Sequence, residues 1–115
     1  MTRVIIFKNK DNHITGYNIS GHSGYDIKGQ DIVCAAISVL AQTALMSLIE
    51  VCGINENIIE YFIDEQEGIL NVDISGSMDM NIEDKSEIVL KTLEIGIKSI
   101  EKSYPEFVTL EYEEV

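Results

Sequence analysis

One cysteine, Cys34, is expected at the N-terminal end of a helix, a position that can support nucleophilic catalysis. Cys34 follows Asp31, whose residue type commonly caps a helix N-terminus, so we expect Cys34 in the first turn of a helix that begins at Ile32. Unpaired backbone N–H groups at a helix start lower the pKa of a thiol and could also donate to an oxyanion. The Asp31 carboxylate opposes a second negative charge, and a helical cysteine is often only a small buried apolar residue. The sequence leaves these effects unresolved.

His22 is the candidate general base for Cys34. It lies in a glycine-rich segment, residues 20–30, that leads directly into the expected helix. A base must reach the proton that it removes. Because Gly21 and Gly24 flank His22 and give the backbone extra conformational freedom, this segment could fold back over the helix start. The pattern therefore predicts a mobile functional loop that carries a base to a thiol.

Two nearby side chains have competing interpretations. Ser38 lies one helical turn after Cys34, where its hydroxyl could bond within the site or back to the preceding turn. Asp31 could orient the His22 ring or only cap the helix, and we expect the cap role. His13 follows a turn cluster and is expected to be an ordinary surface or strand residue.

Other chemistries have less support. His22, Asp31 and Cys34 offer three mixed metal ligands, but the paired spacing typical of zinc sites is missing. The sequence has no phosphate-binding loop or dinucleotide fingerprint, so we expect no cofactor. Cys34 and Cys52 fall near opposite ends of one expected helix, about 27 Å apart, which excludes a disulfide between them. Two free thiols indicate a reducing compartment, so we expect a cytoplasmic protein with Cys52 in its core.

The elements that must position these residues indicate an α+β fold in the order ββαββαβ. Strands and helices are predicted over residues 4–7, 14–19, 32–52, 58–63, 69–74, 83–104 and 107–112, the helices being 32–52 and 83–104. A mostly antiparallel sheet packed with two helices is the natural arrangement. The length of 115 residues indicates one domain over residues 1–115.

Charge and hydropathy narrow the classes of partner. The chain has 20 acidic and 8 basic residues, a formal net charge of −12. Such a surface repels nucleic-acid phosphates and attracts basic partners, so we expect no direct nucleic-acid binding. Residues 32–49 carry no charge and reach the length of a membrane span. Polar residues interrupt this segment, so we expect a soluble protein with this helix buried on more than one side and no membrane partner.

A longer motif resembles a known family. The sequence carries Gly21-His22-Ser23-Gly24, followed by Gly29-Gln30-Asp31-Ile32-Val33-Cys34-Ala35-Ala36-Ile37-Ser38. These two stretches resemble the signature of the ribosomal-processing cysteine protease family. The later stretch Gly96-Ile97-Lys98-Ser99-Ile100, with Tyr104-Pro105 beyond it, resembles that family's second helix. Length and element order match along essentially the whole chain. The resemblance therefore implies a single protease domain.

The resemblance implies a cysteine endopeptidase with a His22–Cys34 dyad. Its substrate would be the N-terminal extension of large-subunit ribosomal protein number twenty-seven, removed during ribosome maturation. Family members are cytosolic homodimers, and a long apolar helix with more surface than one sheet face covers is consistent with a dimer. An acidic protease also suits a basic ribosomal protein.

The resemblance also implies roles for residues around the dyad. Residues on matching family positions are expected to support the site: Gly21, Asp31 and Ser38. Gly24 and Gly29 would be hinges of a loop that closes over the substrate. Ser23 stands where many relatives have alanine, a small change that should not disturb the chemistry.

Two other functions stay open on the residues alone. A non-catalytic ribosome-assembly protein would bind the same basic partner without cutting it. A thiol redox sensor would use Cys34 without any role for His22.

Overall fold

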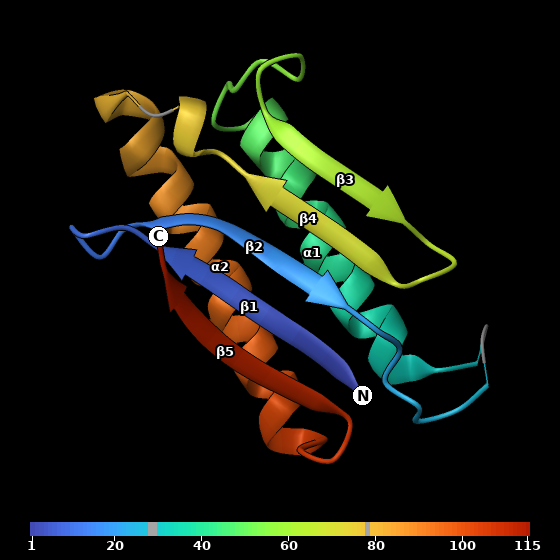
Figure 1. The fold of residues 1–115 in the computed structure, drawn as a ribbon. Coiled ribbons are helices and arrows are strands. Elements are labelled where there is room, and N and C mark those ends of the chain that lie inside the picture. The colour runs from blue at the N-terminus through green and yellow to red at the C-terminus, as the bar shows by residue number, and fades with distance from the viewer. Residues whose placement is uncertain (28–29, 78) are drawn as a thin grey trace.

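The predicted order of elements is confirmed. The structure is a computed structural model that describes residues 1–27, 30–77 and 79–115 of the chain. Within these residues the elements are β1 (Thr2–Lys8), β2 (Ile14–Ser20), α1 (Ile32–Glu50), β3 (Glu60–Asp64), β4 (Ile69–Asp73), a 3-10 turn (Ser75–Ser77), α2 (Met80–Ser103) and β5 (Val108–Glu114). The arrangement is the expected α+β fold (Figure 1).

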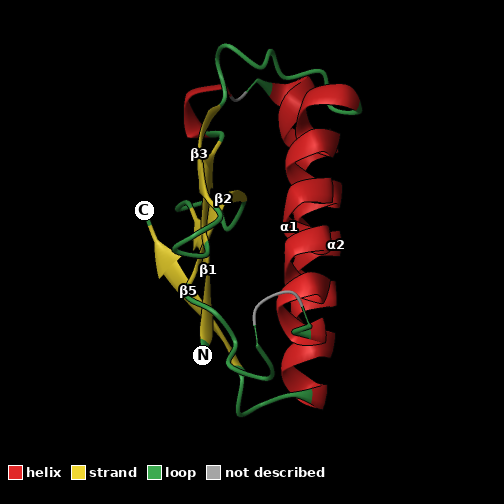
Figure 2. Cartoon of the chain, turned by 90° about the vertical axis from the view of Figure 1, so that its right-hand side faces the viewer, coloured by secondary structure: helices red, strands yellow, loops and turns green. Residues whose placement is uncertain are grey.

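The strands form one mostly antiparallel sheet in the order β3-β4-β2-β1-β5. Neighbouring strands run antiparallel except β1 and β5, which are parallel. Both helices lie on the same side of the sheet, which Figure 2 shows edge-on. This order places β4 directly beside β2, so the turn before β4 lies near the chain that leaves β2.

The core fills the space between the sheet and the helices. Side chains alternate between the two faces of a strand, so Val4 and Ile6 of β1 point into the core and are almost fully buried. Tyr17 of β2 is also buried, and its hydroxyl donates to the Ala41 carbonyl of α1 at 2.7 Å. Burial raises the pKa of Tyr17. This hydrogen bond satisfies a polar group that would otherwise be costly to bury.

The first helix is buried along one face only. Its buried residues recur at helical spacing: Val33, Ile37, Ala41, Ala44, Leu45 and Leu48. The opposite side leaves Ile32, Val39 and Met46 more than half exposed. The expectation of burial on more than one side is therefore wrong for a single chain, because one sheet face and α2 cover only part of α1. By length and composition alone α1 could cross a membrane, although its inner face packs in the core.

The ends of both helices differ slightly from the predictions. Helix α1 ends at Glu50, and Gly53 beyond it has a φ of +78°, a conformation that suits glycine at a helix end. Helix α2 begins at Met80 rather than Glu83, because Asp79 caps it and accepts a hydrogen bond from the Ile82 N–H at 2.9 Å.

The two helices approach each other closely at Gly96. A methyl group on this residue would lie 2.7 Å from Leu40 Cδ1 of α1, closer than carbon atoms tolerate. The glycine therefore allows α2 to pack against α1 at this point. Leu93 and Ile97, on either side of it, are buried in the core.

Candidate active site

Cys34 occupies the first turn of α1, as predicted, and Asp31 caps that turn. One carboxylate oxygen of Asp31 accepts hydrogen bonds from the Val33 N–H at 3.0 Å and the Cys34 N–H at 2.9 Å. The expected cap role of Asp31 is confirmed. The same bonds occupy these two N–H groups, so the expectation that they would hold an oxyanion is wrong.

The second carboxylate oxygen of Asp31 faces the glycine-rich segment. It accepts hydrogen bonds from the Ser23 hydroxyl at 2.5 Å and the Asp26 N–H at 3.4 Å. Burial alone would raise the pKa of Asp31, but the bonds from Ser23, Cys34 and Asp26 outweigh burial and lower its pKa to about 2. Asp31 is therefore a carboxylate near neutral pH, bonded to the helix start and the loop rather than to His22.

The thiol of Cys34 makes two hydrogen bonds with Ser23, one to its main chain and one to its side chain. The Ser23 N–H donates to Cys34 Sγ at 3.2 Å, and the thiol donates to the Ser23 hydroxyl at 3.4 Å. Ser23 is buried, whereas Cys34 is partly exposed. Sequence reasoning assigned Ser23 no role.

The His22 ring is exposed and is held by a main-chain carbonyl. Its Nε2 lies 3.0 Å from the carbonyl oxygen of Gln66, in the β3–β4 turn (residues 65–68). A carbonyl oxygen can only accept a hydrogen bond, so Nε2 carries the proton. In the neutral ring, Nδ1 then carries the lone pair. The nitrogen able to act as a base is therefore Nδ1.

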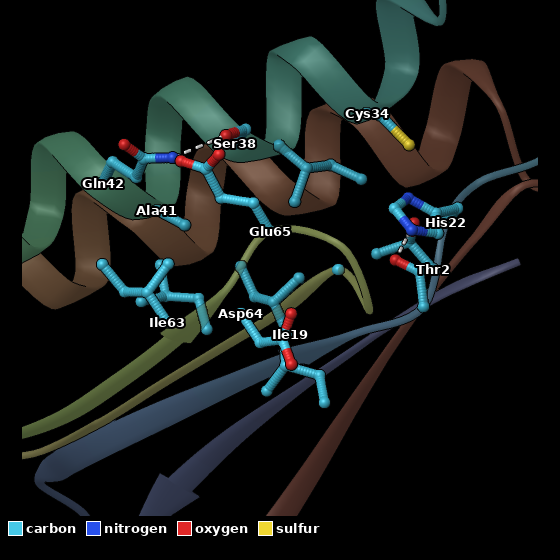
Figure 3. Close-up of a pocket in the computed structure, with 15 residues that line it drawn as sticks. Thr2, Ile19, His22, Cys34, Ser38, Ala41, Gln42, Ile63, Asp64 and Glu65 are labelled. Atoms are coloured by element: carbon cyan, nitrogen blue, oxygen red, sulfur yellow. Dashed lines mark hydrogen bonds between the residues drawn. The ribbon is translucent and has the colours of Figure 1, made fainter. Parts of the chain in front are cut away.

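His22 and Cys34 line one cavity of about 380 Å³. Figure 3 shows the Cys34 side chain pointing from the start of α1 toward His22, on the segment that follows β2. Between these two residues, both in the described part of the chain, no direct hydrogen bond is made. The structure thus brings the expected dyad to one cavity, with each member bonded to another partner.

The cavity is apolar in its interior and acidic at one edge. Helix α1 and strands β2 to β4 contribute its apolar lining: Ile19, Ile37, Ala41, Ile63, Ile69 and Leu70. Asp64 at the end of β3 and Glu65 in the following turn add two carboxylates to the lining (Figure 3). An extended peptide could therefore place an apolar side chain inside while basic groups lie at the edge.

The β3–β4 turn packs tightly against the His22 segment at Gly68. This glycine has a φ of +67°, and a methyl group on it would lie 2.7 Å from the Gly21 carbonyl oxygen and 3.1 Å from His22 Cε1. A side chain there would displace the ring. Sequence reasoning missed Gln66 and Gly68 because their proximity to His22 depends on the strand order, and the hairpin glycine was the only local signal.

The glycines predicted to support the loop have different surroundings. Gly21 has a φ of +83°, and a methyl group on it would lie 2.8 Å from the Met1 carbonyl oxygen, so only glycine fits there. Gly24 has a φ of +76° with open space around it. Gly29 lies outside the described residues. The hinge role of Gly24 and Gly29 stays a prediction.

Ser38 is exposed and lines the cavity beside Cys34. Its oxygen accepts a hydrogen bond from the Gln42 side-chain amide at 2.9 Å. The alternative of a buried hydroxyl bonded to the preceding turn is therefore wrong. Because Gln42 uses the oxygen and not the hydrogen, the Ser38 hydroxyl can donate into the cavity. Gln42 was not predicted from the sequence.

His13 and Cys52, which were not expected to take part in catalysis, lie away from this cavity. His13 Nδ1 lies 3.1 Å from a carboxylate oxygen of Glu83 on α2. Cys52 is buried near the far end of α1, where burial raises the pKa of its thiol, so its predicted core position is confirmed. Among the described residues, no group of three His, Cys, Asp or Glu side chains could hold a metal ion.

The chain is similar to curated proteins over most of its length. The ribosomal processing cysteine protease Prp of Bacillus subtilis is 24% identical and the alignment covers 90% of both chains. The protein of the same name from Staphylococcus aureus strain Mu50 is 27% identical, with 97% of this chain and 99% of the relative covered.

Solved structures share the fold. A Streptococcus mutans crystal structure has a TM-score of 0.83 and 24% identity, covering 100% of this chain and 96% of that one. A ribosomal processing protease Prp from S. aureus, in complex with a covalently linked product peptide, has a TM-score of 0.81 and 24% identity. This match covers 98% of the present chain and 100% of the S. aureus chain.

The family model described as cysteine protease Prp matches residues 1–109, which is nearly the whole chain. Its match includes the capped helix start, the glycine-rich segment and the β3–β4 turn. The chain therefore belongs to the cysteine protease Prp family.

Proposed function

We propose that this protein is a cysteine endopeptidase in which Cys34 is the nucleophile and His22 the general base. The observation that carries the proposal is the shared cavity, where the His22 ring has its Nε2 fixed on Gln66 and its Nδ1 free to accept a proton. Membership in a family of cysteine proteases supports the same chemistry. His13 faces Glu83 of α2 and does not line this cavity.

The proposed reaction proceeds through an acyl-enzyme. Nδ1 of His22 removes the Cys34 thiol proton, and the sulfur attacks the carbonyl carbon of the scissile peptide bond. The imidazolium returns this proton to the amine as the carbon–nitrogen bond breaks, leaving a thioester. Nδ1 then removes a proton from water, whose oxygen attacks the thioester. The carbon–sulfur bond breaks, the carboxylic acid leaves, and the thiol regains its proton.

Two further requirements follow from the geometry. The thiol hydrogen of Cys34 must turn from Ser23 toward His22, because the resting thiol donates to the Ser23 hydroxyl. The oxyanion also needs a donor that the Asp31 cap does not occupy. We assign this donor to the Ser38 hydroxyl, whose hydrogen is not used by Gln42 and which lines the same cavity.

The proposed substrate is the N-terminal extension of large-subunit ribosomal protein number twenty-seven. Relatives named as ribosomal processing proteases support a ribosomal substrate, and an S. aureus relative has been crystallised with a substrate peptide. The net charge of −12 and the acidic cavity edge at Asp64 and Glu65 suit a basic protein. One protease domain over residues 1–115 and a cytoplasmic location belong to the same proposal.

A homodimer is part of this proposal. Ile32, Val39 and Met46 are spaced seven residues apart on α1, so they lie on the same side of the helix, and all are more than half exposed. A second copy of the chain could cover this apolar side.

The test is cleavage of a peptide that spans the extension, followed by mass spectrometry. The wild-type protein should shorten the peptide, whereas Cys34→Ala and His22→Ala should leave it intact. His13→Ala and Cys52→Ala are matched controls that should cleave normally. Undiminished cleavage by either dyad variant would remove that residue from the mechanism. Binding of the peptide without any cleavage by the wild type would favour an assembly protein.

A further inference from the structure

The ring of Tyr25, on the glycine-rich segment, packs against two aromatic rings from the other end of the chain. Its centroid lies 5.4 Å from that of Tyr104, with an angle of 85° between the ring planes. The Phe107 centroid lies 5.3 Å away, at 77°. Both are edge-to-face arrangements, which aromatic rings favour. The contact joins the glycine-rich segment to the turn between α2 and β5, at the same end of the molecule (Figure 2).

Tyr104 and Phe107 form a fixed support, here called the aromatic platform. Tyr104 ends α2, where its N–H donates to the Ile100 carbonyl at 2.8 Å. The Phe107 N–H donates to the Tyr104 carbonyl at 3.0 Å, and the Phe107 carbonyl accepts from the Thr2 N–H of β1 at 2.9 Å. Both side chains pack against the hydrophobic core. The aromatic platform is therefore held by α2, β1 and the core, and not by the glycine-rich segment.

The main chain beside Tyr25 has little support of its own. Gly24 precedes Tyr25 with a φ of +76° and open space around it. Such a glycine leaves the direction of the chain free. Because the Tyr25 ring is 42% exposed, one side of it packs while the other faces solvent. An anchored ring next to a free glycine can fix the direction that the local sequence does not.

From Tyr25, a series of main-chain contacts leads to the catalytic thiol. The Tyr25 N–H donates to the Ser23 hydroxyl at 3.3 Å, and the Ser23 N–H donates to Cys34 Sγ at 3.2 Å. His22 directly precedes Ser23, and its ring is held only by the Gln66 carbonyl. A displacement of Tyr25 would therefore move both Ser23 and His22 relative to the sulfur.

We propose that Tyr25 is a positioning residue whose ring, docked on the aromatic platform, holds the glycine-rich segment where His22 can serve Cys34. This inference rests on the proposed function for the roles of His22 and Cys34. It also gives a role to Tyr104, which the sequence motif places directly after the second helix. The cavity is lined mainly by α1 and the strands, so a peptide could still occupy it without the docked ring. Loss of the ring should thus misplace the base more than it weakens peptide binding.

The first experiment separates these two effects by steady-state kinetics on the extension peptide. Tyr25→Ala should lower kcat by about tenfold and change KM by less than about twofold. Tyr25→Phe keeps both ring contacts and should cleave like the wild type. Urea unfolding under the assay conditions checks that the variants stay folded. An unchanged kcat in Tyr25→Ala, or a rise in KM alone, would overturn the proposal.

A second variant tests whether Tyr25 acts through the aromatic platform. Phe107→Leu removes a ring of the platform but keeps an apolar side chain against the core. In this background, Tyr25→Ala should lower kcat by only about threefold, because part of the contact is already lost. An equal loss in both backgrounds would contradict an action through Phe107.

Fluorescence tests the docking without any cleavage. The chain has no tryptophan, so Tyr25→Trp introduces a single indole. Its emission should shift to longer wavelength when Phe107→Leu is added, because a released ring meets more water. Identical emission with and without Phe107→Leu would show that the ring is not docked. A docked indole in a protein whose wild type leaves every peptide intact would instead refute the protease and leave the anchor in place.

Discussion

The His22 ring is held by the Gln66 carbonyl at 3.0 Å, across 44 positions of the sequence. A main-chain oxygen therefore takes the place that a carboxylate or amide side chain often has beside a catalytic histidine. Asp31, the sequence candidate for this role, instead uses both carboxylate oxygens on the helix start and the glycine-rich segment. The position of the His22 ring thus depends on the β3–β4 turn.

Substitution of Gly68 by alanine should disrupt this support. The new methyl group would contact the Gly21 carbonyl oxygen and His22 Cε1, at a φ of +67° that alanine disfavours. We expect a loss of about 1–2 kcal/mol in the free energy of unfolding and at least about a tenfold drop in kcat/KM. Gly76→Ala is the matched control, because that position has open space. Peptide cleavage and urea unfolding measure both effects, and normal cleavage by Gly68→Ala would show that the turn does not position His22.

Asp31 should make stability depend on acid pH. Its pKa falls from 3.8 to about 2 on folding, so the unfolded chain binds this proton first as the pH decreases. The stabilisation is present above about pH 4 and is lost between about pH 4 and pH 2. Asp31→Asn keeps the cap but lacks this titration. As the pH falls through this range, the difference in the free energy of unfolding between wild type and Asp31→Asn, measured with urea, should therefore narrow. A constant difference would contradict the lowered pKa.

The local parts of the site were predictable, and the long-range parts were not. The cap at Asp31 and the helix position of Cys34 follow from residues adjacent in sequence, and both are confirmed. The contact of His22 with Gln66 requires β4 to pair with β2, a choice that alternating hydrophobicity does not determine. The Ser23 bridge was missed for another reason, since a serine in a loop gives no sign of being buried between a carboxylate and a thiol.

Removal of the Ser38 hydroxyl should slow catalysis more than it weakens substrate binding. In the proposed mechanism this group donates to the oxyanion, which exists only after attack has begun. Ser38→Ala is expected to lower kcat by about tenfold to a hundredfold with little change in KM. Ser99→Ala, an exposed serine on α2, serves as control. Steady-state kinetics on the extension peptide would refute the assignment if KM rose and kcat stayed the same.

A charge on the outer side of α1 should separate a dimer into monomers. Val39 is 65% exposed and lies midway between Ile32 and Met46 on that side, so a partner that covers them would bury it. Burying an unpaired ammonium group is costly, and Val39→Lys should therefore weaken association by at least about tenfold. The single chain should lose little stability, because Val39 is largely exposed in it and surface substitutions typically change stability by about 0.5 kcal/mol or less. Sedimentation equilibrium measures the association directly, with Ile58→Lys as a control at another apolar residue that is more than half exposed and lies outside the helix. A wild-type protein that sediments as a monomer, or a Val39→Lys protein that dimerises normally, would exclude this side of α1 as the interface.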